Sequence, residues 1–280
     1  MQGIPSLNVK NFDDANTKAL LEQAYAKLIA NYQRETISQL MRNQNLSGDM
    51  TSGSVKAARY TNSVSKPYGT ARAAQRGEAL VEKPVLVQVK KYLEIVEEFE
   101  QFDARTAAGY LQEVIAGRNS DHARTVARDL EEDFFLVGRD AGTKVTLTGK
   151  NPAERFEQLV LELTTLRNEF FNGISRNMIF VVMSDAEYSA FRIHLNIDTR
   201  NANVDSAAEN FTQYTGVKVL PTPYLPHDVN IMAMARGAIA APNLILPYST
   251  GGMPASYATI LMTAYALTAA AVMPDTIFWA

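Results

Sequence analysis

The segment from Asn119 to Gly138 is the strongest amphipathic helical pattern in the middle of the chain. Its apolar residues recur at helical spacing and form one stripe: Ala123, Val126, Ala127, Leu130, Phe134 and Val137. Ser120 or Asp121 can cap the start of this helix, and Gly138 can end it, because glycine tolerates the left-handed conformation that is common at helix ends. The sequence therefore predicts a helix over residues 119–138 that buries one face and organises the surrounding fold.

Acidic residues crowd the last part of this helix, where the helix dipole disfavours negative charge. Glu131, Glu132 and Asp133 follow one another there. We expect these carboxylates to find positive partners elsewhere, on this chain or on another copy of it.

The composition narrows the class of protein. A chain of 280 residues with 46% hydrophobic residues can bury a substantial core, in one large domain or in two closely joined ones. Its formal net charge of -3 gives no overall attraction to nucleic acid or to anionic membranes. The sequence has no cysteine, which excludes disulfides, thiolate metal sites and cysteine nucleophiles and fits a reducing compartment. We expect no secretion signal, because no apolar segment stands near the N-terminus.

The apolar run from Tyr257 to Met273 raises the question of a membrane span. It is shorter than the roughly 20 residues that a bilayer core requires, and Pro254 and Pro274 flank it. Its threonines and tyrosines favour a buried strand. We therefore expect a long strand over residues 256–272 and no membrane partner.

The first 46 residues combine an irregular polar segment with a helix, expected over Asp14–Gln44. Because this helix precedes any recognisable core, we interpret residues 1–46 as an arm whose apolar stripe is buried on something else, such as another copy of the chain. The arm also has cations that can face nucleic acid, although nearby acids dilute that signal: Lys18, Lys27, Arg34 and Arg42.

Residues 46–81 are rich in small and polar residues, and two weak strand patterns, at 54–60 and 79–89, predict a long hairpin. A loop this long is either functional or disordered. Between Met50 and Gly77 it has five cations and no acid: Lys56, Arg59, Lys66, Arg72 and Arg76. The stretch 93–104 has acids and no base: Glu94, Glu97, Glu98, Glu100 and Asp103. Opposite charges on two segments suit contacts between copies of one chain, whereas two unrelated solvated clusters explain the charges equally well.

The second half of the chain alternates helices and strands. A capping pattern over residues 151–154 predicts the start of a helix that ends near Gly173, and a second pattern over 184–187 predicts a helix through Leu195. The other expected elements are a helix over 103–117 and strands over 143–148, 178–183, 217–220, 229–235 and 239–241.

No combination of residues supports catalysis. The three histidines, His122, His194 and His227, are far apart in the sequence, and the spacing of His194 and Asp198 is more typical of a hydrogen bond at a helix end than of a metal site. The stretch 142–150 lacks the glycine spacing and the hydroxyl residue of a phosphate-binding loop, and no G-x-S-x-G motif is present. We therefore expect a protein that is not an enzyme and that has no metal or cofactor.

The order of these features resembles the major capsid proteins of tailed double-stranded DNA phages, which have the Hong Kong 97 fold. The features are the helical arm, the basic hairpin, the helix ending DLEEDFFLVGRD, the strand and helix NMIFVVMSDAEYSAF, the strand TGVKVLPTPYLP and the terminal segment TAYALTAAAVMPDTIFWA. The resemblance implies an α+β fold with an N-arm at 1–46, an extended loop at 47–92, a peripheral domain at 93–149 and 248–280 with a long spine helix, and an axial domain at 150–247.

The resemblance also implies partners and a location. Copies of the chain would form the hexamers and pentamers of an icosahedral head that encloses double-stranded DNA, assembled in the host cytoplasm and found in the virion. A separate scaffolding protein, a portal and packaged DNA in weak, non-specific contact would be the other partners. We further expect the loop cations to meet acids such as Glu97, Glu98 and Glu100 of a neighbouring copy. Reversing Arg59 and Arg72 to Glu would then block assembly without unfolding the subunit.

Three other functions fit parts of the pattern. An encapsulin-like compartment shell shares the fold and encloses a protein cargo instead of a genome. A soluble enzyme would require a polar pocket that the sequence does not reveal. A nucleic-acid-binding protein that uses the hairpin is disfavoured, because Tyr60 and Tyr68 are its only aromatic residues.

Overall fold

The computed structural model describes residues 15–63, 65, 67–69, 81–99, 110–197, 213–252 and 259–280. The chain divides into two compact units, each formed by segments that are distant in the sequence. Unit 1 contains Met1–Thr36, Lys91–Arg128 and Asn243–Ala266, and unit 2 contains Ile37–Lys90, Asp129–Pro242 and Leu267–Ala280. The domain boundaries implied by the resemblance to capsid proteins differ from the limits of these two units. They remain a prediction.

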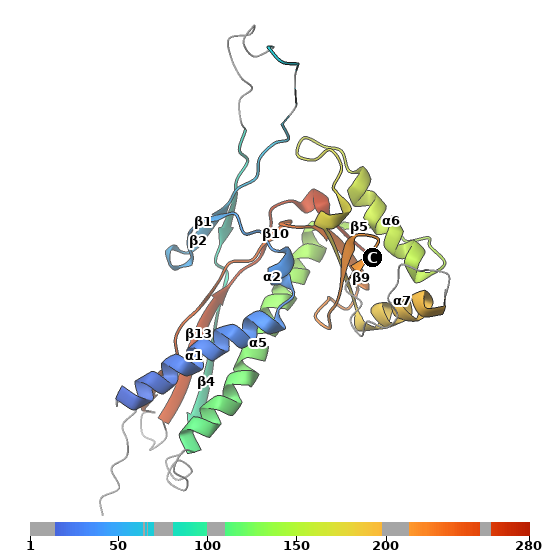
Figure 1. Cartoon of the computed structure of the whole chain (residues 1–280). Helices are drawn as coiled ribbons and strands as arrows, with labels where there is room; N and C mark the ends of the chain where they lie inside the picture. Colours follow the sequence, from blue (N-terminus) through green and yellow to red (C-terminus); the bar gives the residue numbers. More distant parts are fainter. Residues whose placement is uncertain are drawn as a thin grey trace, which may run out of the picture. The chain divides into compact units, whose positions relative to one another are not determined.

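Unit 1 combines two helices with a small sheet (Figure 1). Helix α1 (Ala15–Glu35) contacts the first part of α5 (Tyr110–Ala141), where the side-chain amide of Asn119 donates to the carbonyl oxygen of Ala24 at 2.6 Å. In the sheet one long strand pairs with three others: β13 (Thr259–Leu267) with β4 (Lys91–Phe99), β11 (Asn243–Ile245) and β12 (Ser249–Gly252).

The apolar stripe of the predicted arm is buried within its own chain. Leu21, Ala24, Leu28 and Tyr32 recur at helical spacing along α1 and are each at most 8% exposed. The hydroxyl group of Tyr32 also accepts a hydrogen bond from the side chain of Asn243 at 2.9 Å. The expectation that this stripe is buried on something other than its own chain is therefore wrong for the described part of the arm.

The predicted helix over residues 14–44 is divided in the structure. Helix α1 ends at Glu35, and a short helix α2 (Ser38–Met41) follows in unit 2. The backbone N–H of Thr36 makes the last α-helical hydrogen bond of α1, to the carbonyl oxygen of Tyr32, and the Thr36 hydroxyl donates to the same oxygen. The buried carboxylate of Glu131 accepts from the backbone N–H of Ser38 at 2.9 Å, which favours a new helix start there.

Helix α5 differs from its prediction at both ends. The two helices expected over 103–117 and 119–138 are one continuous helix from Tyr110 to Ala141, as far as the described residues extend. Gly138 does not end it. A Cβ atom at this position would lie 2.9 Å from Sδ of Met232 and 3.2 Å from Cδ1 of Ile239, so Gly138 allows the helix to pack closely against those side chains.

Unit 2 is built on a six-stranded mixed sheet. Its order is β5 (Thr143–Lys144), β15 (Ile277–Trp279), β9 (Ile231–Ala235), β6 (Ile179–Met183), β8 (Val217–Pro221) and β7 (Gln213–Tyr214). Strand β6 is parallel to β8 and antiparallel to β9. All five residues of β6 are buried, as its continuous apolar run predicts.

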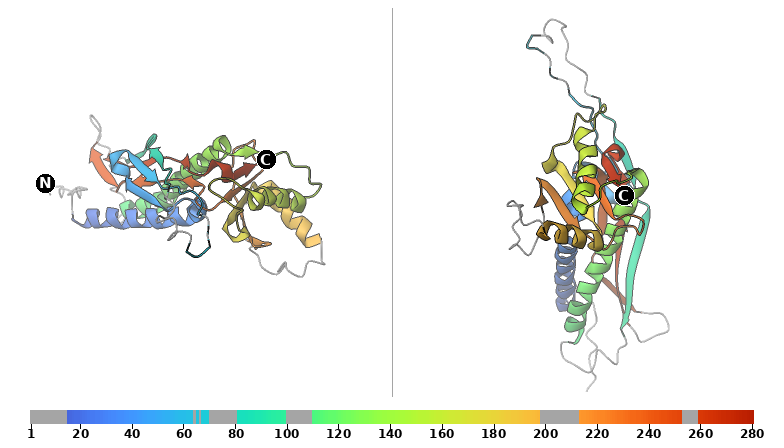
Figure 2. Two further views of the ribbon diagram at one scale, coloured as in Figure 1. Left: turned by 90° about the horizontal axis from the view of Figure 1, so that it is seen from above. Right: turned by 90° about the vertical axis from the view of Figure 1, so that its right-hand side faces the viewer.

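Helices cover both faces of this sheet. Helices α6 (Pro152–Thr165) and α7 (Asp185–Ile197) lie on one face, where Val181 of β6 belongs to the core formed with Phe156 and Phe191 (Figure 1, Figure 2). On the other face, Phe180 belongs to the core formed with Phe134 of α5. Alternate residues of one strand thus serve two cores.

The expected capping patterns are confirmed, but one helix ends early. The side chain of Asn151 accepts from the backbone N–H of Glu154 at 2.8 Å, and Ser184 Oγ accepts from the N–H of Glu187 at 3.3 Å. Helix α6 ends at Thr165 and not near Gly173. The side chain of Asn168 accepts from the two following amide groups, at Phe170 and Phe171, and this turn competes with further helix.

The expected hairpin is present, and the expected terminal strand is divided in two. Strands β1 (Leu46–Asp49), β2 (Ser54–Ala57) and β3 (Val85–Gln88) form an antiparallel sheet at the base of the extended loop. The single long strand expected over 256–272 is divided: β13 and β14 (Ala270–Ala271) belong to different sheets, and β14 pairs with β10 (Ile239–Ala240). Residues 256–258 lie outside the described residues. Within the described ranges, the helices are too short or too polar to cross a membrane.

Candidate functional site

Within unit 2, Arg59 ties the base of the extended loop to residues near Phe170 and Asp275. Its guanidinium group donates from Nη2 to Oδ2 of Asp275 at 2.7 Å and lies 3.5 Å from the ring centre of Phe170. The neighbouring Lys83 forms an ion pair with Glu169 at 2.8 Å. The Arg59 side chain is only 13% exposed, so this cation serves its own chain.

The other loop cations differ in their surroundings. Lys56 forms an exposed ion pair with Glu82 at 3.0 Å, a type of contact that contributes little stability. Lys66, Arg72 and Arg76 lie outside the described residues. Because Arg59 has a structural role, reversing its charge is expected to disturb the loop base as well as any contact with a neighbour.

The described part of the acidic segment lies in β4, and one of its carboxylates is used within unit 1. Glu97 Oε1 accepts from Nε of Arg118 at 2.7 Å, and Glu97 Oε2 lies 3.1 Å from Nε2 of the buried His122. The other ring nitrogen of His122 lies 2.9 Å from the hydroxyl oxygen of Tyr248. Burial acts to raise the pKa of Glu97, but hydrogen bonds from Arg118 and His122 outweigh it and lower that pKa.

Two further acids of β4 face outward. Glu94 and Glu98 are exposed and make no hydrogen bond or ion pair with the residues that the structure describes. They alternate with exposed apolar side chains, since Tyr92 is 71% and Val96 is 49% exposed. Glu100 lies outside the described residues. The outward face of β4 is thus acidic and apolar in alternation.

The four arm cations also differ in their surroundings. Lys18, Lys27 and Arg34 are exposed on α1. Arg42 lies beyond that helix and donates to the carbonyl oxygen of Ala241 at 3.4 Å. The described arm therefore presents three of the four expected cations to solvent.

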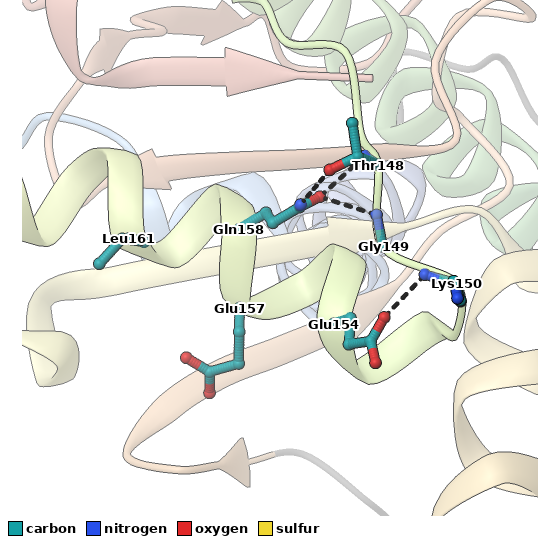
Figure 3. Close-up of a pocket in the computed structure, with 7 residues that line it drawn as sticks. All are labelled: Thr148, Gly149, Lys150, Glu154, Glu157, Gln158 and Leu161. Carbon is teal, nitrogen blue, oxygen red and sulfur yellow. Dashed lines mark hydrogen bonds between the residues drawn. The ribbon is translucent and has the colours of Figure 1, made fainter.

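The stretch 142–150, which resembled a phosphate loop in composition, lies beside a shallow groove along α6 (Figure 3). The side chain of Gln158 accepts from the backbone N–H groups of Thr148 and Gly149 at 3.1 and 3.2 Å, and Glu154 accepts from that of Lys150 at 2.7 Å. These amide groups are therefore used within the chain and are not free for a phosphate. The described residues also contain no group of three or more metal-ligating side chains.

Sequence reasoning did not find the internal partners of Arg59 and Glu97. Asp275 is 216 residues from Arg59, and Arg118 is 21 residues from Glu97. The one available signal was the helical register of α5, which places Arg118 and His122 four residues apart on one face.

Comparison with known proteins identifies the fold. No family model matches the chain, and no curated protein matches it. Among solved structures, the chain is similar to the capsid of the cyanophage P-SCSP1u, with 11% identity, 87% of each chain covered and a TM-score of 0.60. For the capsid of Ralstonia phage GP4 the values are 12%, 81% of each chain and 0.57.

A virus-like particle from Pyrococcus furiosus is also similar, with 12% identity, 92% of this chain and 97% of that chain covered, and a TM-score of 0.56. At such low identity these similarities establish the fold alone. The chain has the α+β, Hong Kong 97-like capsid fold that its sequence led us to expect.

Proposed function

We propose that this chain is the major capsid protein of a tailed phage, which self-assembles into an icosahedral head around double-stranded DNA. The supporting observation is the fold-level similarity to phage capsids over 81% or more of each chain. In this role the chain is a structural protein and not an enzyme. It acts in the virion, after assembly in the host cytoplasm.

In the proposed head, copies of the chain form hexamers and pentamers, with a scaffolding protein and a portal as further partners. Residues 1–46 act as the N-arm, 47–92 as the extended loop, 93–149 and 248–280 as the peripheral domain, and 150–247 as the axial domain. The resemblance to phage major capsid proteins supports these boundaries and partners.

The proposed contacts between copies use opposite charges on the extended loop and on the acidic segment. The loop side has Lys56, whose pair with Glu82 is exposed, and the cations at 66, 72 and 76. The acidic side has Glu94, Glu98 and Glu100. Arg59 and Glu97 have internal partners, which argues against a primary role for them between copies. Electrostatic complementarity of this kind favours correct docking more than raw affinity.

The arm supplies the proposed contact with DNA. Lys18, Lys27 and Arg34 are exposed on one helix, although Glu22 is exposed beside them. Such a mixed surface supports weak, non-specific contact with phosphates.

An encapsulin-like compartment that encloses a protein cargo is the second candidate. The similarity to a virus-like particle from Pyrococcus furiosus, which covers 97% of that chain, favours it specifically.

Electron microscopy of purified particles tests both proposals. The chain is expressed alone and together with the products of neighbouring genes, and the particles are stained and their contents analysed. Closed shells with nucleic acid or with a portal at one vertex are expected. Shells that contain a specific protein and no nucleic acid would favour the compartment, and a monomer under every condition would refute both.

A further inference from the structure

A notch of about 450 Å³ lies at the base of the extended loop in unit 2. Four segments form most of its walls: residues 42–45 before β1, residues 58–60 after β2, residues 171 and 178 between α6 and β6, and residues 236 and 237 in the turn between β9 and β10. The side chains that matter for its chemistry are three arginines and three apolar or aromatic residues: Arg42, Arg59, Arg236, Tyr60, Met178 and Met273.

The notch contains donors that lack acceptors. Nε of Arg59 is buried and has no hydrogen-bond partner, although Nη2 of the same group is paired with Asp275. The guanidinium group of Arg236 is exposed and makes no hydrogen bond or ion pair with any described residue. Because the guanidinium group of Arg236 is accessible and unpaired, a ligand that supplies a carboxylate can form a charge-assisted hydrogen bond with it in the notch.

We propose that this notch binds the carboxylate of Glu94 from β4 of a second copy of the chain. The inference rests on the proposed function and names the partner of the loop base. Glu94 is the acid that fits best, because Tyr92 and Val96 flank it on the same face of β4 and are 71% and 49% exposed. An acid between two apolar side chains matches a notch in which arginines stand beside Met178 and Tyr60, which are 44% and 52% exposed.

Strand geometry lets the same face serve a second contact. Glu98 follows Glu94 by four residues, a separation of about 13 Å along a strand. With one carboxylate in the notch, the other can therefore meet a cation of the loop, such as Lys56, whose pair with Glu82 is exposed. This arrangement uses both outward acids of β4 without disturbing Glu97 inside unit 1.

Chemical cross-linking tests the contact directly, because the chain has no cysteine of its own. Gln44 lines the notch and is exposed, and Val96 lies beside Glu94. We expect particles of the Gln44→Cys, Val96→Cys double variant, treated with a short bis-maleimide, to give a ladder of linked chains on a denaturing gel. The matched control, Arg192→Cys with Val96→Cys, should give none, since Arg192 is exposed on α7 away from the notch lining.

A charge swap tests whether Arg236 and Glu94 of two copies attract each other. Arg236→Glu and Glu94→Arg should each lower the yield of particles at least about tenfold, as expected for loss of a close charge pair, and the combined variant should recover most of the yield. Arg192→Glu should assemble like the wild type. Thermal unfolding of the unassembled subunits should be unchanged by Arg236→Glu, because no described residue pairs with that guanidinium group.

The outcomes separate this inference from the proposed function. If wild-type particles form but the ladder is absent, or the combined variant assembles no better than Arg236→Glu alone, Glu94 does not occupy the notch while the shell proposal stands. If the wild type forms no particles under any condition, the proposed function itself fails.

Discussion

Glu131 of α5 accepts a hydrogen bond from the backbone N–H of Ser38 at 2.9 Å, although the two residues are 93 positions apart. Its side chain is fully buried, and its second carboxylate oxygen has no hydrogen-bond partner among the residues described. Burial raises the pKa of Glu131, against hydrogen bonds from Ser38 and Ile37 that act to lower it. A core carboxylate thus accepts a free backbone N–H at the start of α2, whose N-cap residue is Ile37.

The first prediction concerns the pH dependence of stability. Because the pKa of Glu131 is raised in the folded chain, its stabilising effect is fully present below the unfolded pKa and is lost as pH rises through the folded pKa. Glu131→Gln keeps an oxygen that can accept from Ser38 but does not titrate. We expect this variant to be at least as stable as the wild type near pH 7, with the difference shrinking under acidic conditions.

Urea unfolding at a series of pH values measures this effect. Glu131→Ala removes the cap altogether and should lose about 1 kcal/mol. Glu132→Gln changes the exposed neighbouring carboxylate and should leave the pH profile unaltered. Parallel profiles for the wild type and Glu131→Gln would show that Glu131 does not titrate differently in the folded state.

Local signals explain which elements the sequence predicted. The start of α6 depends on side chains within four residues of one another, and β6 is one uninterrupted apolar run. The likeness to capsid proteins came from the order of such elements, which survives at 11% identity. Fold class was therefore predictable although no single motif is specific.

Long-range contacts explain what the sequence could not predict. The acids at 131–133 were expected to find cations, yet Glu131 binds a backbone N–H group. Arg59 was interpreted as free for a neighbour, yet Asp275 and Phe170 hold it. A charge pattern does not reveal which members are already paired, because the partner comes from a distant segment.

The second prediction compares two glycines of α5. Gly117 has open space around it, so Gly117→Ala should stabilise the chain by about 0.5 to 1 kcal/mol through helix propensity. Gly138→Ala places a methyl group 2.9 Å from Sδ of the buried Met232 and should destabilise it by about 1 to 2 kcal/mol. Chemical unfolding of both variants measures the difference. If the two variants change the free energy of unfolding equally, the side chains around Gly138 must rearrange without cost.

The third prediction separates an internal cation from an exposed one. Arg59→Ala removes a charged hydrogen bond to Asp275 and the stack on Phe170, and should cost about 2 kcal/mol. Lys56→Ala breaks an exposed pair with Glu82 and should cost less than about 0.5 kcal/mol. A double-mutant cycle with Asp275→Ala should show coupling for Arg59. Additive losses in that cycle would contradict a direct interaction.

The fourth prediction compares two adjacent acids of β4 in the unassembled subunit. The pKa of Glu97 is lowered in the folded chain, since hydrogen bonds from Arg118 and His122 overcome the effect of burial. Its contribution to stability is therefore present above the unfolded pKa and is lost as pH falls through the folded pKa.

Glu97→Gln should cost about 1 kcal/mol at neutral pH and weaken the loss of stability in acid. Glu98→Gln, at an exposed position, should change neither quantity, and urea unfolding from neutral to acidic pH distinguishes the two variants. If Glu98→Gln flattens the acid dependence as much as Glu97→Gln does, the internal contacts of Glu97 are not its source.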